Sequence, residues 1–214
     1  MLHIGTTNDG KVREIAALVA PLGIEVVPVA LNIPEPHNNL RDNAWEKARA
    51  YAAHCGGVVL AEDSGLFIRA LNDLPGPYSA RYSRLDRTTM QERPLENPAP
   101  SREDIDRLNN SLVLWEMATV PPEKRVAEFR ICLMVARAGD PTPLYTVETA
   151  YPGVIAPEAR GTEGFGYDPI FIGNDTFGKT LAEIDRARKN LRSHRKSALD
   201  GFYAWASQNL EVFA

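Results

Sequence analysis

A predicted β-hairpin in the second half of the chain restricts the fold more than any other feature. Apolar side chains alternate with other residues from 127 to 135, the period of two that is typical of a strand. A Gly-Asp-Pro turn at 139–141 follows, and residues 144–150 supply a partner strand. Strands joined by so short a turn run antiparallel, so a purely parallel sheet is excluded.

The rest of the chain predicts strands that alternate with helices. Strands are expected at 2–5, 25–29, 58–61 and 169–172, and helices at 11–20, 42–54, 105–117 and 193–210. Strands that are connected through helices are usually parallel neighbours. The two patterns together predict an α/β fold in which a mixed sheet is flanked by helices.

Length and composition predict one domain over residues 1–214, either compact or split into lobes around a cleft. Residues 84–104 differ from the rest because they are proline-rich, charged and poor in apolar side chains. We therefore expect an exposed insertion there rather than a domain boundary.

Charge and cysteine content limit the partners and the compartment. The formal net charge is -4 and the pI about 5.6, so no overall positive field attracts nucleic acid. Cys55 and Cys132 are too few for a disulfide scaffold and are expected to be buried thiols of a reducing compartment. No apolar run approaches the roughly 20 residues of a membrane span, and no signal peptide opens the chain. A cytoplasmic protein without nucleic-acid or membrane partners is predicted.

The segment TTNDGKVREI, residues 6–15, leaves the first strand and enters a helix. A plain turn would need only Asn8, Asp9 and Gly10. Lys11, however, falls in the first helical turn, where the positive end of the helix dipole disfavours a cation. A cation is tolerable there if an anion lies beside it, and phosphate is the usual candidate. The segment therefore predicts an anion-binding turn around Lys11, with Asn8 as the helix cap.

Two carboxylates, Glu62 and Asp63, follow the apolar run at 58–61. Open α/β sheets bind ligands at the carboxyl ends of their strands, and adjacent acids need a cation or hydrogen bonds to offset their repulsion. Glu35, between two prolines, could add an oxygen ligand, and such a set suits Mg²⁺ together with phosphate. The alternative is a solvated turn at the end of the strand.

Two further segments could contact a nucleotide. In residues 161–168 three glycines surround Phe165 and Tyr167, which offers a bare backbone and flat faces to a base or ribose. Alternatively, the glycines only supply unusual dihedral angles and the rings fill the core. Lys189, His194 and Arg195 lie before and at the start of the last helix, either as a solvated basic end or as donors to an oxygen-rich group.

Residues 173–180 match the Walker A pattern letter for letter. Asp175 would place a carboxylate inside a loop that has to wrap phosphates, and too little chain follows Thr180 for the strands of a P-loop sheet. Thr180 and Glu183 instead have the spacing of a capping box. We therefore reject a P-loop.

Six segments, taken in order, resemble the inosine triphosphate pyrophosphatase family, the noncanonical purine nucleoside triphosphate pyrophosphatases that act on dITP and XTP. They are residues 6–14, 42–48, 62–66, 75–82, 164–171 and 193–195. Each piece alone is weak, but six in register across nearly the whole chain are specific. The resemblance implies an elongated mixed sheet that floors a cleft between two lobes, usually within a homodimer.

The resemblance also implies Mg²⁺-dependent hydrolysis of ITP, dITP and XTP to the monophosphate and pyrophosphate. It makes Asp63 and Lys11 the catalytic residues, with Asp63 as the general base, and Glu35, Asp63 and Glu62 the candidate metal ligands. The substrate-binding residues that it implies are Thr6, Thr7, Asn8, Asp9, Gly10, Lys11 and Ser64, and Phe165, Gly166, Tyr167, Asp168, Lys189, His194 and Arg195 around the base.

Two rival functions remain, a pyrophosphatase for other modified nucleotides on the same fold and a nucleotide sensor that binds without turnover. The presence of Lys11 together with Glu62 and Asp63 argues against the sensor, because binding alone does not require an acid that activates water. The sequence leaves open the preference among ITP, dITP and XTP, the residue that excludes the 2-amino group of GTP, and the choice between Glu35 and Glu62 as second metal ligand.

Overall fold

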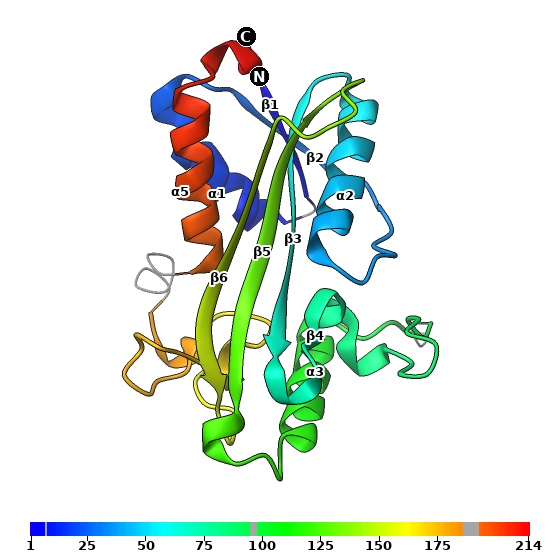
Figure 1. Cartoon of the computed structure of the whole chain (residues 1–214), viewed down its shortest axis with the longest axis vertical. Helices are drawn as coiled ribbons and strands as arrows, with labels where there is room; N and C mark the ends of the chain where they lie inside the picture. The colour runs from blue at the N-terminus through cyan, green and yellow to red at the C-terminus, as the bar shows by residue number, and fades with distance from the viewer. Residues whose placement is uncertain (7, 95–97, 186–192) are drawn as a thin grey trace. The chain divides into compact units, whose positions relative to one another are not determined.

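The computed structural model describes residues 1–6, 8–94, 98–185 and 193–214 (Figure 1). Its helices are α1 (Asp9–Val19), α2 (Leu40–Cys55), α3 (Arg102–Glu116) and α5 (His194–Ser207). Its strands are β1 (Leu2–Gly5), β2 (Val26–Val29), β3 (Val58–Ile68), β4 (Leu74–Pro75), β5 (Val126–Arg137), β6 (Tyr145–Ile155) and β7 (Phe171–Gly173). Short 3₁₀ helices lie at Ala20–Leu22, Arg69–Leu71, Gly76–Arg84, Pro122–Lys124, Asp168–Ile170, Leu181–Glu183 and Leu210–Phe213.

The described strands form one seven-stranded sheet in the order β2-β1-β3-β5-β6-β7, with β4 paired to β3. β1 runs parallel to both β2 and β3, whereas β4 and β7 run antiparallel to β3 and β6. β5 and β6 are neighbours, and Leu144 N–H donates to Val135 O (2.8 Å) where the predicted hairpin closes. The predicted mixed α/β sheet is confirmed.

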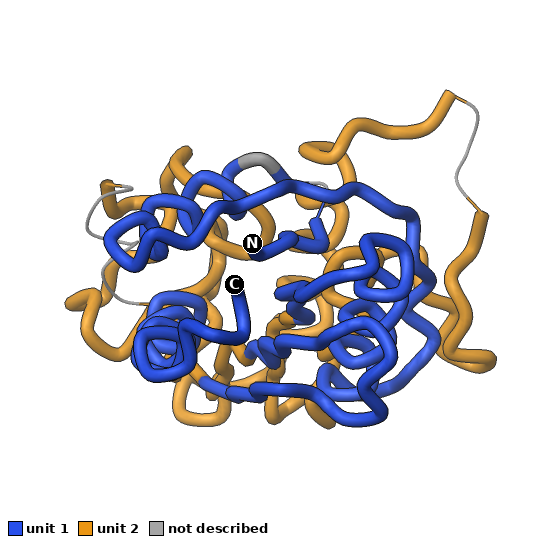
Figure 2. The backbone as a smooth tube through the Cα atoms, turned by 90° about the horizontal axis from the view of Figure 1, so that it is seen from above, with its two compact units in different colours: residues 1–63, 131–149, 194–214 blue, residues 64–130, 150–193 orange. Residues whose placement is uncertain are grey.

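The chain divides into two compact units (Figure 2). Unit 1 comprises residues 1–63, 131–149 and 194–214, and unit 2 comprises residues 64–130 and 150–193. β3, β5 and β6 contribute residues to both units, and each unit has its own apolar core. The expectation that the two form a single domain around a cleft stays a prediction.

The core of unit 1 joins β1 to one face each of α1 and α5. Ile15 and Val19 are four residues apart on α1, and Leu199 and Phe202 are three apart on α5, so each pair lies on one helix face. These side chains pack with Leu2 of β1 and are almost fully buried. Figure 1 shows α1 and α5 beside each other, with α2 on the other side of the unit 1 strands.

Gly5 allows α2 to pack closely on β1. A Cβ atom at Gly5 would lie 2.5 Å from the ring of Tyr51, so a larger residue would push α2 away. The helix is fixed at its start by Asn39, whose side chain accepts the Asp42 N–H (2.8 Å), and at its end by Gly56 with φ of 68°. These contacts position the face of α2 that carries Asn43 and Lys47.

The core of unit 2 is held by a buried arginine. Arg125 has no carboxylate among its described contacts and instead donates to the carbonyl oxygens of Met117 (2.6 Å), Ile155 (2.9 Å) and Ala156 (2.8 Å). These bonds join the end of α3 to the end of β6. Val113 of α3 and Met117, which directly follows the helix, are fully buried in the same core.

The prediction that the third strand ends before Glu62 is wrong. β3 continues from Val58 through both acids to Ile68, and Glu62 and Asp63 are buried within it. Strands tolerate buried carboxylates when cations and hydrogen bonds compensate the charge. The groups that compensate the charges of Glu62 and Asp63 come from segments of unit 1 that are distant in sequence. The local sequence around the two acids therefore did not reveal them.

Other predicted boundaries shift by a few residues. Residues 169–170 belong to a 3₁₀ helix rather than a strand, because Pro169 cannot donate a ladder hydrogen bond, and β7 begins at Phe171. α5 ends at Ser207, and a separate 3₁₀ helix covers Leu210–Phe213. α3 begins at Arg102 because Ser101 accepts the Asp104 N–H (3.1 Å) in a capping box.

Within the described ranges, no helix has the length and apolar character to cross a membrane. Cys55 is half-buried, Cys132 is buried, and both are free thiols. Burial raises the pKa of the Cys132 thiol to about 12, so it stays protonated near neutral pH.

Candidate active site

The loop between β1 and α1 is folded by its own side chains. Thr6 Oγ1 accepts the Asn8 N–H (3.1 Å), and Asn8 Oδ1 accepts the N–H groups of Gly10 (2.9 Å) and Lys11 (3.3 Å). Asn8 is thus the predicted N-cap, and Lys11 stands in the first turn of α1. Thr7 lies outside the described residues.

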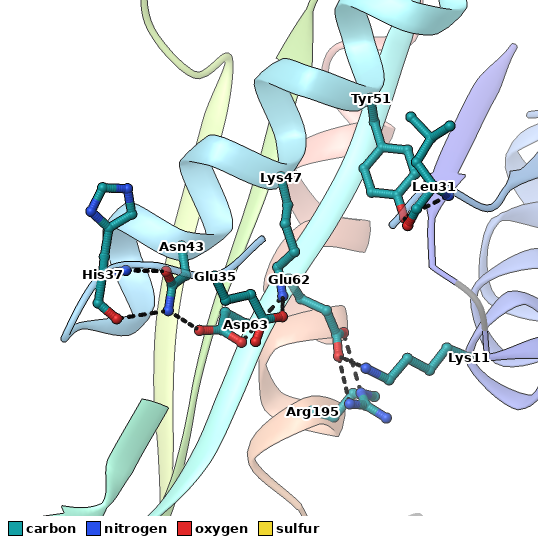
Figure 3. Close-up of polar contacts among 10 residues, drawn as sticks. All are labelled: Lys11, Leu31, Glu35, His37, Asn43, Lys47, Tyr51, Glu62, Asp63 and Arg195. Atoms are coloured by element: carbon teal, nitrogen blue, oxygen red, sulfur yellow. Dashed lines mark hydrogen bonds and ion pairs between the residues drawn. The ribbon is translucent and has the colours of Figure 1, made fainter. Parts of the chain in front are cut away.

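A carboxylate of the protein lies beside Lys11, and the phosphate expected there stays a prediction. Lys11 Nζ lies 2.8 Å from Glu62 Oε1 (Figure 3). Arg195, from the first turn of α5, approaches the same group in a fork, with Nη2 2.5 Å from Oε1 and Nε 3.2 Å from Oε2. Glu62 therefore binds two cations from two helices at once.

Burial sets the electrostatics of this group, which we call the Glu62 cluster (Lys11, Glu62 and Arg195). The Glu62 side chain is only 5% exposed. Burial alone would raise the pKa of Glu62, but Arg195 and Lys11 outweigh it and hold the pKa well below its usual range. Burial lowers the pKa of the Lys11 ammonium, which Glu62 counteracts. Glu62 is therefore charged, and it keeps both cations in place.

Asp63 has separate partners, all from α2 and the loop before it. Lys47 Nζ lies 3.2 Å from Asp63 Oδ1 and 2.7 Å from Glu35 Oε1 (Figure 3). Asn43 Nδ2 donates to Asp63 Oδ2 (3.1 Å), and the backbone of His37 fixes the Asn43 amide through its N–H (3.0 Å) and carbonyl (3.2 Å). We call these residues, Glu35, Asn43, Lys47 and Asp63, the Asp63 cluster.

The pKa values in the Asp63 cluster shift together. Burial raises the pKa of Asp63; Lys47 opposes this shift and Glu35 reinforces it. Burial would lower the pKa of Lys47, but Asp63 and Glu35 outweigh it and raise the value. Asp63 therefore has a higher proton affinity than an ordinary aspartate.

The Asp63 cluster fits a hard divalent cation better than the Glu62 cluster does. Glu35 and Asp63 converge on one ammonium group, so both carboxylates already face a shared positive charge. No group of three or more His, Cys, Asp or Glu residues in the described ranges could hold a metal by itself. Mg²⁺ needs only one or two carboxylates when phosphate oxygens and waters complete its shell. Both oxygens of Glu62, in contrast, already bind cations.

The predicted base-binding segment lies in unit 2. Phe165 exposes 64% of its surface, whereas Tyr167 and Asp168 are buried. The Tyr167 hydroxyl donates to Ser79 O (2.8 Å), and Asp168 Oδ2 accepts the Phe165 N–H (2.8 Å). Phe165 thus presents the ring of this loop, while Tyr167 and Asp168 hold the loop in shape.

The remaining predicted residues are divided between the units. Unit 1 brings together Lys11, Glu35, Glu62, Asp63 and Arg195 (Figure 3). His194 begins α5, and its carbonyl accepts a hydrogen bond from Thr149. Ser64, half-buried in β3, belongs to unit 2, and Lys189 lies outside the described residues. That the sets in the two units form one substrate site stays a prediction.

Sequence reasoning missed the roles of Asn43 and Lys47. Both lie in a segment of the family resemblance, but nothing in the chain order linked them to Asp63. Their spacing of four residues places them on one face of α2. This spacing was the available signal, and it becomes informative only once α2 is known to face β3.

The Walker-like loop does not present its backbone to a ligand. Its N–H groups at Asn174, Thr176 and Lys179 donate to Pro152 O, Gly173 O and Thr176 O. The Thr180 N–H donates to the Glu183 carboxylate (2.8 Å), as the capping box predicted. A phosphate-binding loop would aim such N–H groups at the ligand.

The Lys179→Ala variant is therefore expected to behave like the wild type. Lys179 is exposed, and exposed substitutions usually change the free energy of unfolding by less than about 0.5 kcal/mol. Steady-state kinetics with a nucleoside triphosphate and a thermal melt check both expectations. A collapse of kcat in this variant would restore the P-loop interpretation.

Comparison with known proteins identifies relatives along most of the chain. A sequence profile of the Ham1 family matches residues 2–205. The dITP/XTP pyrophosphatase of Thioalkalivibrio sulfidiphilus is 41% identical over 202 residues, which cover 92% of this chain and 93% of that one. The dITP/XTP pyrophosphatase of Geobacillus kaustophilus is 40% identical over 201 residues, which cover 92% and 89%.

Solved structures show the same similarity. A HAM1 protein from Coxiella burnetii has a TM-score of 0.80 at 30% identity, covering 97% of this chain and 98% of that one. A Mycobacterium abscessus protein described as a nucleoside-triphosphatase and dITP/XTP pyrophosphatase has a TM-score of 0.72 at 30% identity, covering 94% and 96%.

Proposed function

The chain belongs to the Ham1 family, and we propose that it is a dITP/XTP pyrophosphatase. It hydrolyses dITP, XTP and ITP to the nucleoside monophosphate and pyrophosphate, and so removes noncanonical purine nucleotides from the pool. The observation that carries the proposal is the buried acid–base arrangement of unit 1, in which Asp63 lies beside Lys47 and Glu62 beside Lys11.

In the reaction, each cluster has its own part. Lys11 carries the positive charge that the substrate phosphates require, and Glu62 holds both Lys11 and Arg195 in a fixed geometry before substrate arrives. Asp63 orients a water and takes its proton as the water attacks the α-phosphorus. Asn43 and Lys47 each bind one oxygen of the Asp63 carboxylate and so fix its orientation.

The metal belongs to the Asp63 cluster in this proposal. Glu35 and Asp63 would hold Mg²⁺, whose charge neutralises phosphate oxygens when it is bound. Lys47 offers a positive charge between the same two carboxylates, which keeps them together in the free protein.

The Glu35→Gln variant is therefore expected to need more Mg²⁺. Loss of one of two carboxylate ligands should raise the concentration for half-maximal activity by at least about tenfold. A Mg²⁺ titration of initial rates at saturating dITP measures this, with Glu25→Gln as the matched control because Glu25 is exposed. An unchanged requirement in Glu35→Gln, with a raised one in Glu62→Gln, would transfer the ligand role to Glu62.

Base selection is assigned to Phe165, His194 and Arg195. The exposed Phe165 ring offers a stacking face, and donors from the start of α5 suit the 6-oxo group of hypoxanthine and xanthine. A site built to hydrogen-bond a 6-oxo group rejects the 6-amino group of adenine by factors of about 10⁴. A panel of dITP, XTP, dGTP and dATP tests the proposal through kcat/KM. Equal values for dITP and dATP would refute it.

The family resemblance also supports a homodimer as a proposal, and the cysteine content supports a cytoplasmic location as another. Sedimentation velocity at micromolar protein checks the first. The rival function as a nucleotide sensor predicts binding of dITP without product, and the same substrate panel distinguishes the two.

A further inference from the structure

The loop at residues 164–168 is a tight turn closed by Asp168. Its carboxylate accepts the Phe165 N–H (2.8 Å) and is almost fully buried. A Cβ atom at Gly164 would lie 2.1 Å from Asp168 Oδ2, and the residue has a φ of 84°, so only glycine fits there. The turn leaves Phe165 mostly exposed, while its backbone N–H is bound by Asp168.

Helix α3 holds this turn through the peptide groups of a single residue. The Gly166 N–H donates to Asp106 Oδ2 (2.8 Å), and the Gly166 carbonyl accepts from Asn110 Nδ2 (2.9 Å). Asp106 and Asn110 are four residues apart, so they stand one above the other on the same face of α3. Both hydrogen-bonding groups of Gly166 are thus bound by one helix.

The side chain of the preceding residue, Asn109, has other hydrogen-bond partners than Asn110. Asn109 accepts the Ser83 N–H (2.8 Å) and donates to Ser79 O (3.2 Å), and it ties the helix to the core of unit 2. Asn110 is also buried, yet its Oδ1 meets no donor among the described residues. The described hydrogen bond of the Asn110 side chain therefore goes to Gly166 in the turn.

We propose that Asp106 and Asn110 are positioning residues that hold Phe165 in place for the purine ring of the substrate. The inference rests on the proposed function, because it takes Phe165 as the stacking face for the base. A ring on a loosely held turn has to be ordered at each binding event, and that entropy cost weakens affinity. When the N–H and the carbonyl of Gly166 are both hydrogen-bonded to α3, the turn is held before substrate binds, and binding loses less entropy.

Four variants distinguish the effect of the two hydrogen bonds to Gly166 from a general effect on stability. Asn110→Leu and Asp106→Leu remove the bonds to Gly166, whereas Asp106→Asn keeps a side-chain oxygen that can accept its N–H. Ser111→Ala is the matched control, since Ser111 is exposed on the same helix. Amide hydrogen exchange in the substrate-free protein is the first measurement. The Gly166 amide should exchange about 2- to 10-fold faster in Asp106→Leu than in the wild type, and the control should not differ.

Steady-state kinetics with dITP is the second measurement. KM should rise about 2- to 10-fold in Asn110→Leu and in Asp106→Leu, with the effect on KM rather than on kcat. Asp106→Asn should recover most of the loss. A purely structural role would instead lower the melting temperature and the amount of active protein, and would leave KM unchanged.

The outcomes distinguish this inference from the proposed function. If the wild type hydrolyses dITP and KM is unchanged in both leucine variants, the positioning role is overturned and the pyrophosphatase stands. If the wild type hydrolyses neither dITP nor XTP, the proposed function fails and the inference fails with it. Faster Gly166 exchange together with a raised KM supports the inference.

Discussion

The Asp63→Asn protein is expected to fold like the wild type and to lose about 10²–10⁴-fold in kcat on dITP. An amide does not accept the proton of water and is a poor ligand for Mg²⁺. The fold should survive because Lys47 keeps its ion pair with Glu35 (2.7 Å) when the charge at position 63 is removed. No buried cation is therefore left without a partner.

Circular dichroism, a thermal melt and dITP turnover measure this expectation together. Asp200→Asn is the matched control, because Asp200 is an exposed carboxylate that pairs with Lys196 on α5. The control should keep both stability and turnover. Wild-type turnover in Asp63→Asn would remove Asp63 from the mechanism.

The Glu62→Gln protein is expected to lose about 3 kcal/mol in the free energy of unfolding. Removal of one partner from a buried ion pair typically costs about 3–5 kcal/mol, and here it leaves both Lys11 and Arg195 without their carboxylate. The Lys11 and Arg195 side chains are 23% and 15% exposed, so water solvates part of their charge. We therefore expect the lower end of the range of about 3–5 kcal/mol. Urea unfolding at neutral pH measures the difference.

Adding Lys11→Met to Glu62→Gln should recover part of the free energy of unfolding, because it removes one of the two cations that lost their carboxylate partner. A double-mutant cycle should give a coupling of about 1–3 kcal/mol between positions 11 and 62. Additive effects would mean that the pair does not contribute to folding.

The pH dependence of the Glu62→Gln effect has a defined sign. The folded protein depresses the pKa of Glu62, whereas the unfolded chain has the ordinary value of about 4.3. A depressed pKa contributes stability above the unfolded value, and this contribution falls as the pH drops toward the folded value. The difference between wild type and Glu62→Gln should therefore be constant near neutral pH and narrow below about pH 4.3.

The sequence predicted an anion beside Lys11, with phosphate as the candidate, and did not predict an acidic side chain of the protein there. A lysine in the first turn of a helix signals an anion through purely local physics. The structure supplies Glu62, which is 51 positions away and reaches Lys11 only because β1 and β3 are parallel neighbours. The role of Lys11 toward the substrate phosphates stays a prediction.

Residues 161–168 show how far a local pattern can be interpreted. The sequence allowed either exposed ring faces or rings that fill the core, and the structure contains one of each. Phe165 is exposed, whereas Tyr167 is buried and bound to Ser79. The two rings differ because Gly166, with φ of 62°, turns the chain between them. Both the N–H and the carbonyl of Gly166 are bound by α3, which is distant in sequence.

The most direct test of the account is hydrolysis of dITP in H₂¹⁸O with Mg²⁺, followed by mass spectrometry of the products. Attack of an Asp63-oriented water on the α-phosphorus predicts that the label enters dIMP and that the pyrophosphate is unlabelled. The Asp63→Asn protein should form neither product at a comparable rate. Label in pyrophosphate would contradict attack at the α-phosphorus and indicate attack at the β-phosphorus instead. Release of orthophosphate in place of pyrophosphate would contradict the proposed function itself.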